Sequence, residues 1–510
     1  MTVPAVTEVS GSQVRRFLAI DDDPRWIAFA MTVPGRAVLF VAFGAVLAAT
    51  AEPRVAVVAV AGAAACAFLK ERRDYVLLLS MLAGLFLSPA WHWGTSLPGF
   101  LRERGSGLHV AQAQRVFTIA ILGLSLLSLR YTRQHPSSFY ARRPVVSLLG
   151  VMLSLTLFAL ALPRQAVAIV FLVLWLKTMA AYMWFLCYAV VDQRSRQRPS
   201  MPYALGTFRP FWAPFTTPLG KGAAYLSRME SRSREDLART QLKAVKLLVW
   251  ATVLFQLSHG LQAASTRLLG VPPLHEVLEA FVHGSAPTVA AGWIALVVGT
   301  ARAALELAGW GHQIVACARL GGFRLPRNTF RPLESRTLVD FWNRYFFYFK
   351  ELLVDFFFYP TFFRFFRKRP RVRVFFATFV AAGVGNALYH FVRDVDLLFT
   401  MGPRAALVGF ESYVFYATIL AIGIGLSQAR LGTVASSRSR SVDGGALGRV
   451  WSFACVWGFV ACLHIFGGIE ARTYSLSDRL SFMAHELGVP DAVLGGPAAR
   501  SASNVERNAK

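Results

Sequence analysis

A histidine in an apolar run and a set of polar side chains in an aromatic stretch are the residues best suited to chemistry. His390 lies near the end of FVAAGVGNALYHFVRD, and FWNRYFFYFKELLVDFFFYP occupies positions 341–360. That stretch and the residue before it carry Asp340, Asn343, Arg344, Lys350, Glu351 and Asp355. An imidazole suits a general base because its pKa lies near neutrality, and amide or guanidinium groups stabilise developing negative charge. From the residues alone, however, a packing histidine near a membrane interface is the simpler interpretation of His390.

The six polar residues share one face if the stretch is a continuous helix. At about 100° per residue they fall within an arc of about 140°. Aromatic and aliphatic side chains cover the remaining surface, and Pro360 is expected to end the helix. Two interpretations stay open. The polar stripe faces water from an interfacial helix, or it lines a water-filled cavity inside a bundle.

Composition places the whole chain in a membrane. Of its 510 residues, 55% are hydrophobic and only 16% are charged, against about 25% charged residues in a soluble domain. Apolar runs recur at the length of about 20 residues that a bilayer-crossing helix needs. We therefore expect an all-α fold, a polytopic transmembrane bundle of about eleven spans with additional interfacial or re-entrant helices.

The basic charge also fits a membrane protein better than a nucleic-acid-binding one. The formal net charge is +26, yet no nucleic-acid-binding motif is present. The basic residues gather in alternate short loops, which predicts a cytoplasmic N-terminus, an external C-terminus and a multi-pass protein of the inner cell membrane. Five cysteines are scattered without a CxxC pair, so neither a disulfide framework nor a metal site is expected.

The expected spans and loops divide the chain into five parts. A polar N-terminal segment, 1–35, precedes N-terminal transmembrane helices over 36–191. A basic cytoplasmic loop, 192–244, is expected to lie on the membrane interface, and a second transmembrane core covers 245–468. The expected spans are roughly 36–51, 54–69, 74–90, 116–130, 144–162, 166–191, 245–263, 286–308, 373–391, 404–428 and 449–468. Residues 469–510 form a polar C-terminal tail.

The region around the aromatic stretch resembles a known family. The segment ARLGGFRLPRNTFRPLESRTLVDFWNRYFFYFKELLVDFFFYP is similar to the signature region of membrane-bound O-acyltransferases, especially the branch with alginate O-acetyltransferase and the teichoic-acid D-alanyl transferase. The matching residues are Ala318, Arg319, Leu320, Gly322, Phe323, Leu325, Pro326, Asn328, Arg331, Pro332, Asp340, Phe341, Trp342, Arg344, Asp355 and Pro360. His390 falls at the position of the family's histidine. The resemblance covers about 309–395 and implies a membrane-bound acyltransferase fold for the core over 245–468.

Three positions depart from the family pattern. Phe346 stands where the family has histidine or asparagine, His312 where it has an aspartate, and Val354 where an arginine precedes Asp355. The resemblance implies His390 as general base, with Asn343 as a second catalytic residue. Arg344, Asp340, Asp355 and His312 are expected at the substrate-binding site. A structural role for His312 is the alternative, and Asn386 is a candidate to orient His390.

The function implied by the resemblance is O-acyl transfer. An acyl group such as acetyl would pass from acyl-CoA or another acyl thioester to a hydroxyl on a glycan, lipid or secreted product. No bound cofactor or metal is expected, and the partners are the acyl donor, the hydroxyl acceptor and membrane lipids, with no nucleic acid. The alternative is a catalytically impaired relative that acts as a scaffold with envelope-assembly proteins. A transporter is the third hypothesis, favoured only by the number of spans.

Overall fold

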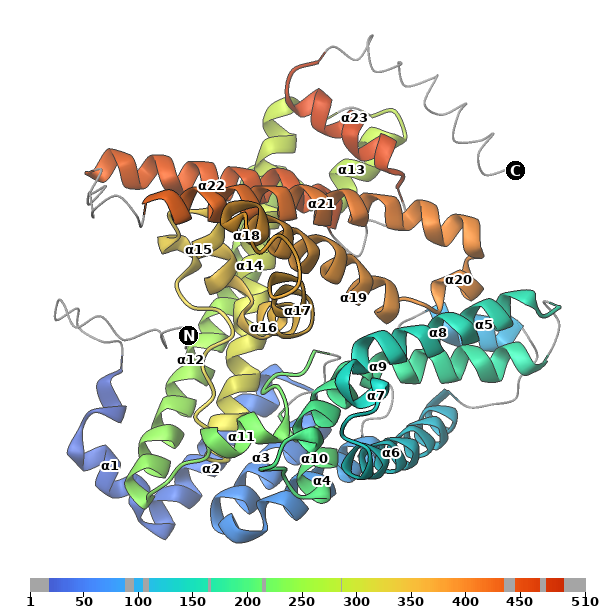
Figure 1. The fold of residues 1–510 in the computed structure, drawn as a ribbon. Coiled ribbons are helices and arrows are strands. Elements are labelled where there is room, and N and C mark those ends of the chain that lie inside the picture. The colour runs from blue at the N-terminus through green and yellow to red at the C-terminus, as the bar shows by residue number, and fades with distance from the viewer. Residues whose placement is uncertain are drawn as a thin grey trace.

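The part of the chain that the structure describes is built from helices, from η1 near the N-terminus to α23 near the C-terminus (Figure 1). The computed structural model describes residues 18–87, 96–103, 110–163, 167–212, 217–285, 287–434, 445–467 and 474–489. Within these ranges no strand occurs, and one isolated antiparallel bridge joins Glu230 to Phe323. The all-helical prediction is therefore confirmed.

Nine helices in the described ranges are long and apolar enough to cross a membrane. They are α2 (Val33–Thr50), α6 (Val110–Gln134), α8 (Pro144–Ala161), α9 (Val167–Arg194), α12 (Arg234–Leu268), α14 (Val289–Leu320), the continuous run of α18 (Pro370–Phe379), η6 (Val380–Gly385) and α19 (Asn386–Arg393), α21 (Pro403–Val434) and α22 (Ala446–Gly467). Each matches an expected span, and the chain is a multi-pass membrane protein. In Figure 1, α12 runs beside α14, α8 beside α9, and α21 beside α22.

The two expected spans that remain form a bent pair. Residues 54–69 correspond to α3 (Pro53–Phe68) and residues 74–90 to α4 (Arg73–Leu87), joined by η2 (Lys70–Arg72). The two helices meet at a bend of 115°, so together they could also form one broken span or a re-entrant loop. The expected number of about eleven spans is therefore not confirmed.

Shorter helices connect and cover these long ones. They are η1 (Ala19–Asp21), α1 (Pro24–Met31), α5 (Ser96–Glu103), α7 (Phe139–Arg142), α10 (Met201–Gly206), α11 (Ala223–Met229), α13 (Leu274–Val282), η4 (Pro332–Glu334), α15 (Leu338–Tyr345), α16 (Phe347–Leu353), η5 (Val354–Phe358), α17 (Tyr359–Phe362), α20 (Leu397–Thr400) and α23 (Leu476–Glu486). The elements η5 and η6 are turns of π-helix.

Hydrogen bonds join the basic loops to one another. The Arg133 guanidinium donates to Gln193 (2.6 Å), and the Ser200 hydroxyl donates to Asp74 (3.0 Å). Nearby, Arg73 pairs with Glu230 at 2.9 Å. These contacts bring the segments around 133, 193–200, 70–74 and 230 together. That they face the cytoplasm stays a prediction of the alternation of basic charge. The basic residues 437–440 lie outside the described residues.

The described part of 192–244 differs from a surface-lying loop. Its aromatic side chains Phe208, Phe211 and Trp212 are buried in the protein core. The helix α12 begins at Arg234, inside the expected loop, because Ser233 caps it by accepting a hydrogen bond from the Asp236 amide. The expected C-terminal tail contains α23, which opens with a capping box at Ser475, and the residues after 489 lie outside the described ones.

Candidate functional site

The aromatic stretch 341–360 is divided into short helices. The chain leaves helical geometry at Phe346 (φ −138°, ψ 80°), between α15 and α16. The loop around residues 328–330 forms backbone hydrogen bonds with the residues on both sides of this break. The Phe347 amide donates to the Asn328 carbonyl (2.9 Å), and the Phe330 amide donates to the Arg344 carbonyl (2.8 Å). The expected continuous polar face is therefore absent, because the backbone changes direction in its middle.

Pro360 also differs from its expected role, since helix α17 continues through it to Phe362. The preceding turn, η5, is π-helical, and the Tyr359 amide bonds back to the Val354 carbonyl. A proline in an α-helix clashes with the carbonyl four residues earlier. We attribute the tolerance of Pro360 to the wider π-helical turn, which moves that carbonyl away.

The break separates the polar residues into two groups. On α15, Arg344 pairs with Asp340 (2.6 Å) and approaches Glu334 (3.6 Å). Asn343 is exposed on the same helix and forms no side-chain hydrogen bond with the described residues. Lys350, Glu351 and Asp355 belong to the second group, on α16 and η5. The structure shows no contact between Asn343 and His390, the two residues expected to be catalytic.

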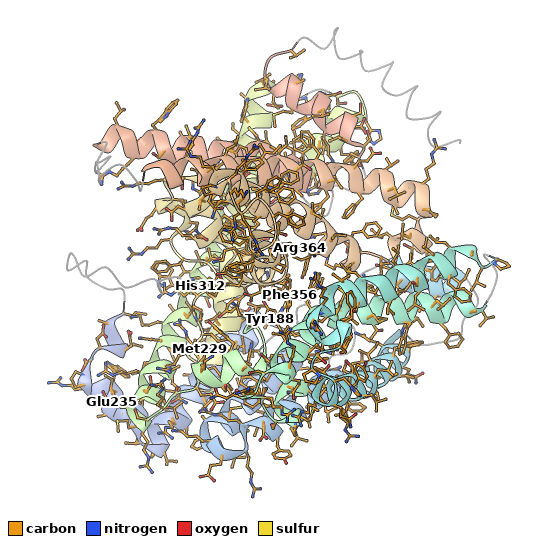
Figure 2. All side chains as sticks on the ribbon, viewed as in Figure 1. Tyr188, Met229, Glu235, His312, Phe356 and Arg364 are labelled. Atoms are coloured by element: carbon orange, nitrogen blue, oxygen red, sulfur yellow. The ribbon has the colours of Figure 1, made fainter. Side chains whose placement is uncertain are left out.

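The second group meets a lysine from a distant loop. The Lys221 ammonium lies 2.6 Å from a carboxylate oxygen of Glu351 and 3.0 Å from one of Asp355. Lys350 contacts the other Glu351 oxygen at 2.8 Å, and the Tyr188 hydroxyl of α9 donates to Asp355 at 2.9 Å. Figure 2 shows Tyr188 and Phe356 near the centre of the molecule, and their rings lie 4.7 Å apart.

Charge and burial act in opposite directions on these groups. Burial raises the pKa of the Asp355 carboxyl above its ordinary value, against the opposing charge of Lys221. Burial disfavours ionised Glu351 as well, but the charges of Lys350 and Lys221 outweigh it and lower the pKa of Glu351. For Lys221, burial is outweighed by the two carboxylates, which raise its pKa. Lys221 therefore stays charged and, together with Lys350, balances the charge of the two carboxylates.

The backbone at Lys221 is held in an uncommon conformation. Its φ is 55°, in the left-handed region that side chains other than glycine rarely adopt. The preceding Gly220 has φ 116°, and a Cβ atom at Gly222 would lie 2.3 Å from a carboxylate oxygen of Asp192. The flanking glycines thus let the loop pass close to α9 while it delivers Lys221 to the carboxylates.

His390 lies on α19 within a group of aromatic rings. Its ring centroid is 4.3 Å from that of Tyr413, 5.2 Å from Tyr389 and 5.9 Å from Phe349. The Tyr413 hydroxyl donates to the buried Asn386 side chain at 2.9 Å. Asn386 thus holds Tyr413, which packs on His390, and any orientation of the imidazole by Asn386 acts through that ring.

The two segments that carry the family resemblance pack directly together. Phe349 of α16 contacts both Tyr389 (4.8 Å between ring centroids) and His390. A Cβ atom added at Gly385 would lie 2.7 Å from the Phe357 ring, so glycine allows the two π-helical turns to meet. Thr217, in the same loop as Lys221, hydrogen-bonds the Tyr389 hydroxyl at 2.6 Å. We call this meeting of loop 217–222, residues 349–357 and residues 385–390 the central junction.

Two further positions depart from the family pattern, Phe346 and His312. Phe346 places its ring 5.5 Å from that of Phe349, where the family carries a polar side chain. His312 is buried on α14, close enough to Arg327 and Arg319 for their charges to act on it. Its Nδ1 has no hydrogen-bond partner among the described residues, and no contact joins it to His390. Asp355 and His390 therefore reach the junction, whereas Asp340, Asn343, Arg344 and His312 lie on other elements.

Sequence reasoning missed three residues that shape the junction: Lys221, Tyr188 and Tyr413. A signal for Lys221 was present, because the chain has only eight lysines and this one follows an apolar, proline-rich segment between two glycines. Tyr188 and Tyr413 lie in long apolar runs, and nothing in their local pattern marks them.

The central junction contains an imidazole that could transfer a proton, His390, which packs against aromatic rings. It also contains two carboxylates, Glu351 and Asp355, which pair with lysines. Within the described residues, no three His, Cys, Asp or Glu side chains converge as a metal site. The expectation of no metal and no bound cofactor remains a prediction. In comparisons with known proteins, no protein-family model matches the chain, and no curated protein matches it with significant similarity.

Proposed function

We propose that this multi-pass membrane protein is an O-acyltransferase. It moves an acyl group such as acetyl from a thioester donor, for example acyl-CoA, to a hydroxyl on a glycan, lipid or secreted product. The observation that carries the proposal is the central junction. The two segments that resemble the family signature lie about 30 residues apart in sequence, and they pack together with His390 beside Phe349. Both contain a turn of π-helix, a feature frequent at functional sites.

In the proposed reaction, His390 is the general base. The imidazole takes the proton of the acceptor hydroxyl while the hydroxyl oxygen attacks the thioester carbonyl. The carbon–sulfur bond then breaks, and the protonated imidazole returns the proton to the leaving thiolate, so the imidazole ends neutral. Tyr413 packs over the imidazole and restricts its rotation. Asn343 has no part in this proton transfer, because it lies exposed on α15 beyond the break at Phe346.

The test is turnover of a labelled short-chain acyl thioester by the purified protein with a hydroxyl acceptor. Loss of a general base costs about 10²–10⁴-fold in rate, so His390→Ala is expected to lose at least about a hundredfold. The matched control is His259→Ala, an exposed histidine on the membrane helix α12, which should retain activity. A loss smaller than tenfold, with unchanged thermal stability, would assign His390 a packing role.

A specific observation favours a second candidate, a non-enzymatic scaffold in envelope assembly. Phe346 presents an apolar ring to Phe349 where the resemblance implies a polar partner. The variant Phe346→His distinguishes the two. Improved turnover would mean a weakened active site, whereas absence of both thioester hydrolysis and transfer in the wild type and this variant would favour the scaffold.

We also propose that α3 and α4 cross the inner membrane separately, which gives about eleven spans. Phe40 of α2 meets Phe68 at the end of α3 (6.1 Å between centroids), while Gly44 packs against Val60. From the first contact to the second, the residue number rises along α2 and falls along α3. The two helices are therefore antiparallel. The 16 residues of α3 extend about 24 Å, and flanking polar residues make up the remaining thickness.

A further inference from the structure

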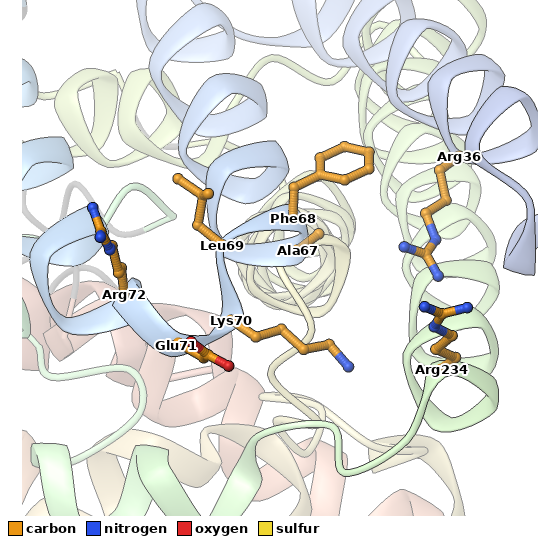
Figure 3. Close-up of a pocket in the computed structure, with 8 residues that line it drawn as sticks. All are labelled: Arg36, Ala67, Phe68, Leu69, Lys70, Glu71, Arg72 and Arg234. Carbon is orange, nitrogen blue, oxygen red and sulfur yellow. The ribbon is translucent and has the colours of Figure 1, made fainter.

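A basic cavity lies away from the central junction, where three helices end. It has a volume of about 380 Å³ and is lined by Arg36, Ala67, Phe68, Leu69, Lys70, Glu71, Arg72 and Arg234 (Figure 3). These residues come from the start of α2, the end of α3 with η2, and the start of α12. None of the expected catalytic or substrate-binding residues lines it.

Three cations converge in this cavity. Figure 3 shows the Arg36 and Arg234 guanidinium groups facing each other, with the Lys70 side chain extending toward them. Their charges act on one another, since Arg36 and Arg234 both lie within electrostatic range of Lys70. Like charges this close repel, and a bound anion would remove that cost.

In the described part of the chain the three cations form no ion pair, because the carboxylates near the cavity pair with other residues or with none. Among the described residues, none of Arg36, Lys70 and Arg234 forms a salt bridge. Glu230 pairs instead with Arg73, the residue that directly follows η2, at 2.9 Å. Asp236 accepts a hydrogen bond from the Arg232 amide (3.0 Å) and lies 3.5 Å from Arg324. Glu71 also lines the cavity, but its single negative charge leaves an excess of positive charge there for a ligand.

One of the three cations is held in place by the protein. Arg36 is buried, and its guanidinium donates to the carbonyls of Ala30 (3.2 Å) and Met31 (3.5 Å) at the end of α1. A guanidinium fixed in this way loses little freedom when it binds an anion, and its planar donors match a phosphate group. Lys70 and Arg234, which make no side-chain hydrogen bond in the described structure, can adjust around it.

The cavity also has an apolar wall. Phe68 and Leu69 lie next to the cations and keep 50% and 51% of their surface exposed. Because α2 and α12 are candidate membrane spans, their ends place the cations near the level of lipid headgroups. A basic pocket between membrane helices beside exposed apolar side chains suits a lipid that carries a phosphate and acyl chains.

We propose that this cavity binds the phosphate of an anionic phospholipid, with Arg36, Lys70 and Arg234 around the phosphate and Phe68 and Leu69 against the acyl chains. The site is separate from the proposed acyl-transfer chemistry. Phosphate is also present in soluble ligands such as coenzyme A, so the test must distinguish a lipid from a soluble phosphate.

The experiment titrates delipidated, detergent-purified protein with dioctanoyl phosphatidylglycerol, dioctanoyl phosphatidylcholine, coenzyme A or inorganic phosphate. Binding follows from the rise in thermal midpoint with ligand concentration and from bound mass in native mass spectrometry. The test variant is Lys70→Gln/Arg234→Gln, which removes two cations that hold no other side chain. Arg72→Gln/Arg232→Gln removes the same charge from the same two segments. In Figure 3, Arg72 points away from the three cations, and Arg232 does not line the cavity.

We expect phosphatidylglycerol to bind more tightly than phosphatidylcholine and at least tenfold more weakly to the test variant, with little change in the control. A loss of at least tenfold is expected because hydrogen bonds between a phosphate and charged side chains are stronger than those between neutral groups. Equal loss in both variants would reduce the effect to bulk charge and overturn the proposal. Stronger binding of coenzyme A or inorganic phosphate than of the lipid, lost in the same test variant, would overturn the lipid assignment.

Discussion

Lys221 pairs with two half-buried carboxylates at the central junction, and its removal is expected to destabilise the protein. The Lys221, Glu351 and Asp355 side chains keep only 16%, 21% and 27% of their surface exposed. Unpairing buried charges costs about 3 kcal/mol or more. Lys221→Met keeps the length of the side chain and removes the charge, so its thermal midpoint should fall clearly below that of the wild type at pH 8.

The pH dependence of that loss has a definite sign. Without Lys221, burial raises the pKa of Asp355 further above its ordinary value, so the folded state binds a proton more readily than the unfolded state. Stability then increases as the pH falls through the folded pKa. The gap between the midpoints of Lys221→Met and the wild type should therefore narrow as the pH falls from 8 to 5. Lys243→Met, at an exposed position on α12, is the control, and a gap that stays constant between pH 5 and 8 would contradict the prediction.

At the scale of single elements, α23 carries a buried acid that should make its packing depend on pH. The Glu486 carboxylate lies against Gly292 of α14, where a Cβ atom would come within 1.7 Å of it. Neither oxygen has a hydrogen-bond partner among the described residues, and burial raises the pKa of Glu486 to about 7. Between its unfolded pKa, about 4.3, and about 7, the packed helix holds a proton that the released helix loses. Packing therefore weakens as the pH rises.

Hydrogen exchange of peptides from 476–486, corrected for the intrinsic rate, should show faster local opening at pH 8 than at pH 5.5. Glu486→Gln removes the ionisation and should abolish the difference. The neighbouring His485, 3.0 Å from the Pro287 carbonyl, is the competing source of a pH effect. If His485→Gln abolishes the trend and Glu486→Gln leaves it, the prediction is wrong.

Element by element, the sequence predicted what depends on local pattern. Hydropathy located the nine long helices because an apolar run of that length indicates a membrane-crossing helix without any knowledge of tertiary contacts. The break at Phe346 depends on the Asn328 carbonyl, supplied by a loop outside the helix, so a uniform 100° rotation could not show it. Motif spacing marked His390 and Asp355. Their partners Tyr413, Lys221 and Tyr188 come from segments whose approach only the folded chain reveals.

At the scale of the whole molecule, the orientation of α3 and α4 sets the topology. If each crosses the membrane, six spans precede Arg196, and the loop around it lies on the same side as the N-terminus. If the bent pair forms a single broken span, five spans precede it and the two lie on opposite sides. If the pair forms a re-entrant loop, four spans precede it and the two again lie on the same side. In each case five candidate spans follow, from α12 to α22, so the C-terminus lies across the membrane from Arg196.

The antiparallel course of α2 and α3 and the hydrogen bonds among the basic loops both favour two separate crossings. We therefore expect reporter fusions at the N-terminus and at Arg196 to report the cytoplasm, and a fusion at the C-terminus to report the outside. An N-terminus opposite to Arg196 would establish the bent pair as one broken span. Arg196 and the C-terminus on the same side would contradict the span assignment between α12 and α22, and with it the placement of His390 near the end of a membrane-crossing run.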